Sequence, residues 1–190
     1  IGSYIVKLSG LDVTAAESKE ITMILHNIGD LERISDHAKN LAESAQELHT
    51  KKLSFSEDAQ AELEVFMKAV KEIVGMSVES FEQEDVEKAA LVEPLEEVID
   101  AIRSEVKNRH VLRLQKGKCT IELGFILQDV GTNLEGVADH CSNLAVCTIE
   151  TQNDQFDMHH YINNIKKYDK DHFADRVSEY EKKYALPEIV

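Results

Sequence analysis

The feature that most constrains the fold of this chain is a phrase that it contains twice. Residues 30–42 read Asp-Leu-Glu-Arg-Ile-Ser-Asp-His-Ala-Lys-Asn-Leu-Ala, and residues 133–145 read Asn-Leu-Glu-Gly-Val-Ala-Asp-His-Cys-Ser-Asn-Leu-Ala. Both copies keep the pattern Leu-Glu-x-x-x-Asp-His-x-x-Asn-Leu-Ala. Self-similarity at a fixed separation is the sequence signature of repeated structural units. The two copies therefore predict an internal duplication.

Each copy lies within a long stripe of apolar residues spaced three and four positions apart. The first stripe begins at Thr14, which forms a capping-box pattern with Glu17, and runs to about His49. The second begins at Thr120 and continues through Ala145. Such stripes predict amphipathic helices well above the usual length, and long helices of this kind pack as a long bundle.

Two further helices are predicted between these stripes. One follows a cap at Ser54 or Ser56 and ends before a turn at Glu84-Asp85. The next begins at Val86 and contains Pro94, which predicts either a kink or a helix start near that residue. Its expected end is Gly117, a glycine suited to a left-handed cap. A last short helix is expected from Asp171 to Tyr184, because Pro187 follows it.

No segment shows the strand alternation of a β-protein, and the 190 residues include only two prolines and eight glycines. We therefore predict an all-α fold, an antiparallel bundle of long helices in three-helix units joined by short turns. Residues 1–52 are expected to form a truncated first repeat, residues 53–152 a second three-helix repeat, and residues 153–190 a polar tail with a short helix. The first eight residues have the pattern of the end of a helix, so the chain is expected to be the C-terminal part of something longer.

Composition excludes some classes of protein. A formal net charge of −15 argues against a nucleic-acid partner, which would require a basic surface. No apolar run approaches the roughly 18 residues of a membrane span. The three cysteines form no Cys-x-x-Cys pair, which indicates reduced thiols in a cytosolic protein. Cys141 and Cys147 are expected to pack as small apolar side chains.

Paired carboxylates are the candidate chemistry of the chain. Residues four apart on a helix lie about 40° apart around its axis, so their side chains can converge on one cation. Oxygen-only sites suit magnesium, calcium, manganese or iron ions. One pair comes from each copy of the phrase and a third from the helix before the second copy, and adjacent helices could bring two pairs together. The candidate metal ligands are Glu32, Asp36, Glu96, Asp100, Glu135 and Asp139. The alternative is that these acids only solvate helix faces.

Neighbouring polar residues leave two interpretations open. His37 and His140 could donate to a carboxylate beside a metal or lie at the edge of the bundle, and the edge is favoured. Asn40 and Asn143 could order the carboxylates or bond to the neighbouring helix. The basic residues of segment 103–118 suit a surface that complements a helix dipole, or a contact with phosphate, anionic lipid or a membrane-embedded partner.

A catalytic function finds no support in the motifs. The sequence contains no Glu-x-x-His, no His-Glu-x-x-His, no P-loop and no glycine-rich dinucleotide turn. No serine or cysteine stands in a recognisable nucleophile setting. The protein is therefore expected not to be an enzyme.

The phrase at residues 30–42 resembles the signature helix of the PhoU family of phosphate-regulatory proteins, and residues 92–100 resemble the acidic segment of the preceding PhoU helix. Residues 4–9, 113–119, 139–143 and 181–187 resemble the cytosolic C-terminal region of bacterial sodium/phosphate cotransporters. This resemblance implies two PhoU repeats and clusters of iron or other metal ions bound by the six acids named above. Gly136 and Asn133 depart from the first copy, which has Arg33 and Asp30 there. The helices that would complete the site of Glu32 and Asp36 are absent.

Two functions follow as expectations. The first is a regulatory domain at the cytoplasmic face of the plasma membrane, with the transporter's membrane domain upstream in the same polypeptide. The second is a stand-alone soluble PhoU-like regulator of phosphate uptake that binds metal. A helical scaffold without metal is the third alternative. Because the truncated first repeat leaves an apolar stripe uncovered, we also expect a homo-oligomer.

Overall fold

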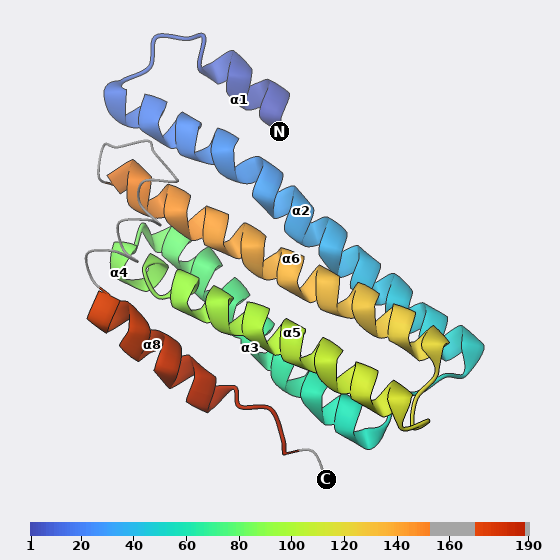
Figure 1. Ribbon diagram of the computed structural model, residues 1–190. Helices are drawn as coiled ribbons and strands as arrows, with labels where there is room; N and C mark the ends of the chain where they lie inside the picture. Colours follow the sequence, from blue (N-terminus) through green and yellow to red (C-terminus); the bar gives the residue numbers. More distant parts are fainter. Residues whose placement is uncertain (153–169, 189–190) are drawn as a thin grey trace.

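The computed structural model describes residues 1–152 and 170–188, and every regular element in those ranges is an α-helix. This confirms the predicted all-α fold. Most of the described chain lies in four long helices, three shorter ones completing the structure (Figure 1). The helices are α1 (Gly2–Leu8), α2 (Ala15–Lys51), α3 (Glu57–Gln83), α4 (Val86–Ala89), α5 (Val92–Gln115), α6 (Ile121–Gln152) and α8 (Lys170–Lys183).

The helix ends follow local signals in the sequence. Thr14 forms the predicted capping box with Glu17, and Ser56, not Ser54, caps α3 by accepting a hydrogen bond from the Ala59 amide. Pro94 lies in the first turn of α5, where its missing amide hydrogen leaves no helix bond unmade. Gly117 has a φ of 68° after the end of α5, as predicted.

The helices α3, α5 and α6 form a three-helix unit, and α2 packs along the outer side of α6 (Figure 1). Consecutive long helices run in opposite directions, so α2 and α6 are antiparallel neighbours although one lies near each end of the sequence. This arrangement places the two copies of the repeated phrase against each other. The boundary predicted at residues 52 and 53 falls between α2 and α3, but the division into repeats stays a prediction.

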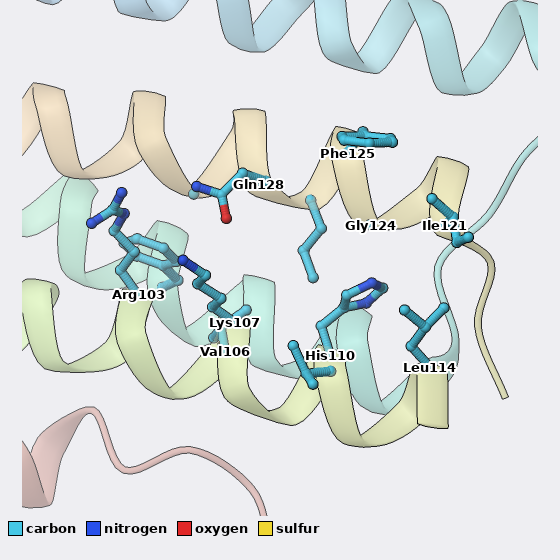
Figure 2. A pocket seen from close by; sticks show the side chains of 13 residues that line it. Arg103, Val106, Lys107, His110, Leu114, Ile121, Gly124, Phe125 and Gln128 are labelled. Atoms are coloured by element: carbon cyan, nitrogen blue, oxygen red, sulfur yellow. The ribbon is translucent and has the colours of Figure 1, made fainter. Parts of the chain in front are cut away.

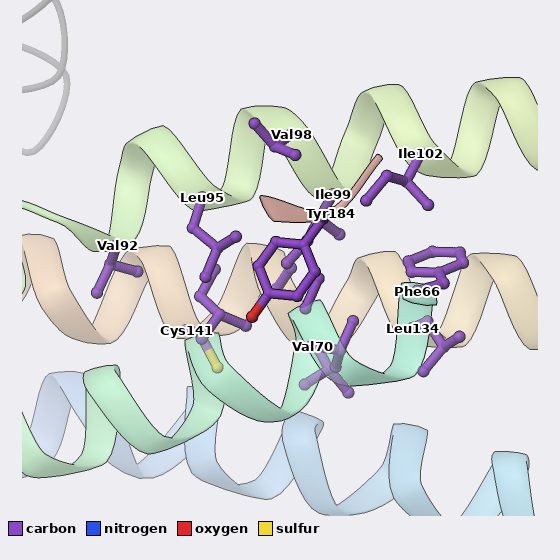
Figure 3. Close-up of a cluster of buried hydrophobic side chains, with 14 of the residues drawn as sticks. Phe66, Val70, Val92, Leu95, Val98, Ile99, Ile102, Leu134, Cys141 and Tyr184 are labelled. Carbon is purple, nitrogen blue, oxygen red and sulfur yellow. The ribbon is translucent and has the colours of Figure 1, made fainter. Parts of the chain in front are cut away.

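The hydrophobic core lies inside the three-helix unit. Phe66 of α3, Ile99 of α5 and Leu134 of α6 are among its buried side chains (Figure 3). Cys141 and Cys147 are buried and free, as predicted for small apolar side chains. In contrast, α2 buries only Met23 and Asn27, because one face of this helix has no neighbouring helix along most of its length.

The short helix α8 docks on the three-helix unit. Tyr184 joins the core cluster and donates a hydrogen bond to Glu72 of α3, which also pairs with Lys183. The predicted tail helix therefore exists, from Lys170 instead of Asp171. Residues 153–169 and 189–190 of the predicted tail lie outside the described residues. No helix within the described ranges is both long and apolar enough to cross a membrane.

Candidate functional site

The structure brings two of the three predicted carboxylate pairs together. Glu96 and Asp100 of α5 face Glu135 and Asp139 of the antiparallel helix α6. The carboxyl groups of Asp139 and Glu96 lie within hydrogen-bonding reach of each other, and so do those of Glu135 and Asp100. Four carboxyl groups thus meet at the interface of two helices, which is the arrangement predicted from their spacing. We call these four residues the carboxylate cluster.

The pKa values of two carboxyl groups of this cluster, those of Glu135 and Asp139, are raised. Partial burial is the largest cause that raises the pKa of Asp139, followed by the charge of Asp100. Burial also raises the pKa of Glu135, and the charges of Asp100 and Asp139 add to it. A raised pKa means that the ionised carboxylate is less stable in the folded protein than in water. A cation between the carboxylates would offset this loss of free energy.

Arg103 supplies a positive charge to the cluster. Its Nη1 atom donates to Oε1 of Glu135 at 2.9 Å, and its charge lowers the pKa of both Glu135 and Asp139. No group of three or more histidine, cysteine, aspartate or glutamate side chains in residues 1–152 and 170–188 could hold a metal ion in its present arrangement. Metal binding would therefore require new side-chain rotamers, beginning with the contact between Arg103 and Glu135.

The donor set of the cluster fits a hard or borderline metal ion. Its four side chains offer oxygen atoms alone, which suits magnesium, calcium, manganese or iron. The guanidinium of Arg103 occupies a position where such an ion would supply positive charge. The residues that would hold the ion are Glu96, Asp100, Glu135 and Asp139.

The structure does not bring the third pair into this cluster. Glu32 and Asp36 are exposed on α2, away from the interface of α5 and α6. The two copies of the phrase are therefore unequal in their surroundings, and the copy on α6 has the more complete set of carboxylates.

A second polar network, which the sequence did not predict, joins the two copies across α2 and α6. Nδ1 of His140 lies 2.8 Å from Oδ1 of Asp30, and the Asn143 amide donates to the same oxygen at 3.1 Å. The interpretation of His140 as a residue at the bundle edge is wrong, since its ring lies between two helices. Asn143 bonds to the neighbouring helix, which was one of its two predicted roles.

The other half of this network repeats the first with the copies exchanged. Nδ1 of His37 lies 2.9 Å from Oδ1 of Asn133, and the Asn40 amide donates to that oxygen at 3.0 Å. The rings of His37 and His140 lie with their centroids 5.6 Å apart and their planes tilted by 32°. Each histidine and asparagine therefore bonds to the residue that opens the other copy, Asp30 or Asn133. The departure of Asn133 from the first copy keeps this oxygen acceptor.

Gly136, the other departure from the first copy, has a steric cause in the same network. A Cβ atom at residue 136 would lie 2.5 Å from Cε1 and Nε2 of His37. The glycine therefore makes room for the histidine ring of the opposite helix. Repeated motifs alone could not show this, because the contact joins helices far apart in the sequence.

We predict that Gly136→Ala is less stable than Gly29→Ala by about 1–2 kcal/mol in urea unfolding. Alanine in a helix interior gains about 0.5–1 kcal/mol over glycine, and at Gly29 nothing lies within 4 Å of the new Cβ. At Gly136 the ring of His37 must move, which costs its hydrogen bond to Asn133, worth about 1 kcal/mol. Equal stabilisation by the two substitutions would contradict the packing described here.

The fold and the paired carboxylates define a helical-bundle protein with a duplicated acidic motif. The chain belongs to the PhoU family, because the family described as the PhoU domain matches residues 1–45 and 63–148. This confirms the resemblance found in the sequence. The chain is also 32% identical over 133 residues to a protein of Thermotoga maritima named "Phosphate-specific transport system accessory protein PhoU homolog 1". The aligned part is 69% of this chain and 56% of that relative, so the chain spans little more than half of its length. No solved structure matches the chain.

Proposed function

We propose that this chain is a non-catalytic regulator of phosphate transport that binds a divalent or iron ion through its carboxylate cluster. The observation that carries the metal site is the meeting of Glu96 and Asp100 with Glu135 and Asp139 across α5 and α6, with raised pKa values at Glu135 and Asp139. Membership of the PhoU family and the name of the T. maritima relative support the link to phosphate transport.

The site test is elemental analysis of anaerobically purified protein. We expect bound metal in the wild type and less than half as much in Asp139→Asn, which replaces one oxygen ligand with an amide of the same shape. Asp129→Asn is the matched control, because Asp129, like Asp139, is exposed on α6, but it lies outside the cluster. Unchanged metal content in Asp139→Asn would contradict the proposed site. Asp36→Asn tests in the same way whether the pair on α2 holds a second ion.

The setting of this domain is the second part of the proposal. We favour a regulatory domain of a sodium/phosphate cotransporter at the cytoplasmic face of the plasma membrane, with the membrane domain upstream in the same polypeptide. The stand-alone regulator is the alternative, and the accessory-protein name of the relative favours it. The coding sequence upstream of Ile1 discriminates between them. Several apolar spans of about 20 residues support the transporter domain, and their absence supports the stand-alone protein.

A homo-oligomer completes the proposal. Of the 37 residues of α2, only Met23 and Asn27 are buried, and Leu31 is 39% exposed. Pairing this face with a second copy would cover its apolar side chains and bring new groups to Glu32 and Asp36. A monomer in light scattering at high protein concentration would contradict this part of the proposal alone.

A further inference from the structure

An apolar cavity lies between α5 and α6, near the turn that joins them (Figure 2). Its volume is about 260 Å³, and none of the four residues of the carboxylate cluster lines it, although Arg103, which pairs with Glu135, does. Val106, Leu114 and Leu127 provide apolar walls. Ile121 and Phe125 at its mouth are 67% and 68% exposed. The described residues therefore leave an apolar slot open to a ligand.

One end of this slot is cationic. Figure 2 shows Arg103 and Lys107 at one end of the cavity and Leu114 and Ile121 at the other. Arg103 is already paired with Glu135. Lys107 forms no ion pair or hydrogen bond within the described part of the chain. A protein with a net charge of −15 thus places an unpaired ammonium beside an apolar cavity.

The remaining polar lining does not add charge at the apolar end. Burial lowers the pKa of His110 and the charge of Arg113 lowers it further, against a smaller opposing effect of Glu62, so a positive charge on this imidazole is disfavoured. The cavity is therefore apolar along its length with positive charge at one end. Its volume is below the roughly 300–1,000 Å³ of sites for drug-sized ligands, which favours one narrow chain as occupant.

We propose that this cavity binds a small amphipathic carboxylate, with its alkyl chain between α5 and α6 and its carboxylate on Lys107. The alkyl chain covers the exposed faces of Ile121 and Phe125, and the ammonium gains the counter-ion that it lacks. The proposal requires no metal ion and rests on Lys107, which does not contact the carboxylate cluster, and not on Arg103, which does.

The test is isothermal titration calorimetry of the whole chain with octanoate and with 1-octanol. We expect octanoate to bind with one site per chain and at least fivefold more tightly than 1-octanol. Lys107→Gln is expected to weaken octanoate binding about fivefold, the effect of losing one exposed charge contact, and to leave 1-octanol unchanged. Lys68→Gln, an exposed lysine of α3 outside the cavity, is the matched control and is expected to bind like the wild type.

A second variant tests the cavity itself. A Cβ atom at Gly131 would lie 3.8 Å from Cγ of Arg103 and 4.0 Å from Cε1 of Phe66, so Gly131→Met fills the space that this glycine lines. We expect this variant to lose octanoate binding. Gly75→Met, at a helical glycine with nothing within 4 Å, is expected to retain it. Circular dichroism verifies that both variants are folded.

Three results would overturn the proposal. The first is no heat of binding for octanoate up to millimolar concentration. The second is equal affinity for octanoate and 1-octanol with no effect of Lys107→Gln, which would remove the role of the charge. The third is binding to phosphatidylglycerol vesicles in sedimentation without binding to free octanoate, which would assign this face to a membrane surface instead of a single ligand.

Discussion

Arg113→Ala is expected to lower the free energy of unfolding by about 3–5 kcal/mol, the largest effect predicted for any substitution here. Arg113 of α5 donates from Nη1 and Nη2 to the two carboxylate oxygens of Glu62 of α3, each at 2.8 Å. Glu62 is 2% exposed and Arg113 is 6% exposed. Truncating the arginine leaves a buried carboxylate without its hydrogen-bonded counter-ion. Arg109, whose Nη1 lies 3.6 Å from Glu62, offsets part of the loss.

Lys68→Ala provides a matched control for this prediction. Lys68 and Glu64 also pair at 2.8 Å on α3, but their side chains are 63% and 64% exposed. Exposed pairs contribute about 0–1 kcal/mol because water solvates both charges. Urea unfolding should therefore separate the two variants by at least 2 kcal/mol. Losses that agree within 1 kcal/mol would show that Glu62 is not buried as described.

A double variant separates the cost of an unpaired charge from the value of the pair. Replacing both partners, as in Glu62→Leu with Arg113→Met, removes the buried charges together. Buried ion pairs replaced by apolar side chains of similar size are often neutral in stability. We therefore expect the double variant to be more stable than Arg113→Ala alone.

This ion pair also marks the limit of what the sequence could predict. The basic segment at residues 103–118 looked like a surface that complements a helix dipole. Arg113 instead reaches Glu62, which is 51 positions away in the sequence, and Arg109 bonds to the carbonyl of Pro187. Arg113 lies in the last turn of α5, where a cation suits the helix dipole, but it is buried and does not belong to an exposed basic surface. Periodicity gives the face of a helix but not the residue that another helix brings to it.

The helices themselves were predictable because their signals are local. The capping box of Thr14, the helix start near Pro94 and the left-handed Gly117 each involve residues within one or two turns of each other. Apolar spacing placed most helix ends within three residues of those observed. The sequence predicted that α8 is a helix. It could not predict where α8 docks, because the docking depends on contacts of Tyr184 with α3.

The carboxylate cluster was predictable for a different reason. Glu96 and Asp100 share the spacing of Glu135 and Asp139, and adjacent helices of an up-and-down bundle must face each other. The position of Arg103 was missed, although it follows Asp100 by one helical turn and so lies on the same face. The network of His37 and His140 was missed because it joins the two copies to each other, which a repeat seen as two separate helices does not indicate.

Asp139→Asn is expected to stabilise the metal-free protein at pH 7 and to remove the stabilisation that metal provides. Partial burial and the charge of Asp100 raise the pKa of Asp139 in the folded chain, so the folded state binds a proton more readily than the unfolded state does. The wild type therefore loses stability as the pH rises through the ordinary aspartate pKa to the raised one. The asparagine of the variant does not titrate, so Asp139→Asn does not lose stability in this way.

The pH dependence supplies the check on this argument. As the pH falls through the raised pKa of Asp139 toward the ordinary aspartate pKa, the stability advantage of Asp139→Asn should shrink. Thermal unfolding of both metal-free proteins between pH 4 and 7 measures it. If Asp139→Asn is less stable than the wild type across that range, the ionised Asp139 side chain does not destabilise the folded protein. Asp129→Asn, exposed on the same helix, should follow the wild type.

Adding metal should reverse the order of the two proteins. A ligand that binds only the folded state at 100 times its dissociation constant stabilises it by about 2.7 kcal/mol. Manganese at that level should raise the unfolding free energy of the wild type by this amount and that of Asp139→Asn by much less. The same carboxylate then destabilises the empty site and stabilises the loaded one, and that reversal separates a metal ligand from an acid that only solvates a helix face. Equal gains in both proteins would assign the metal to other residues.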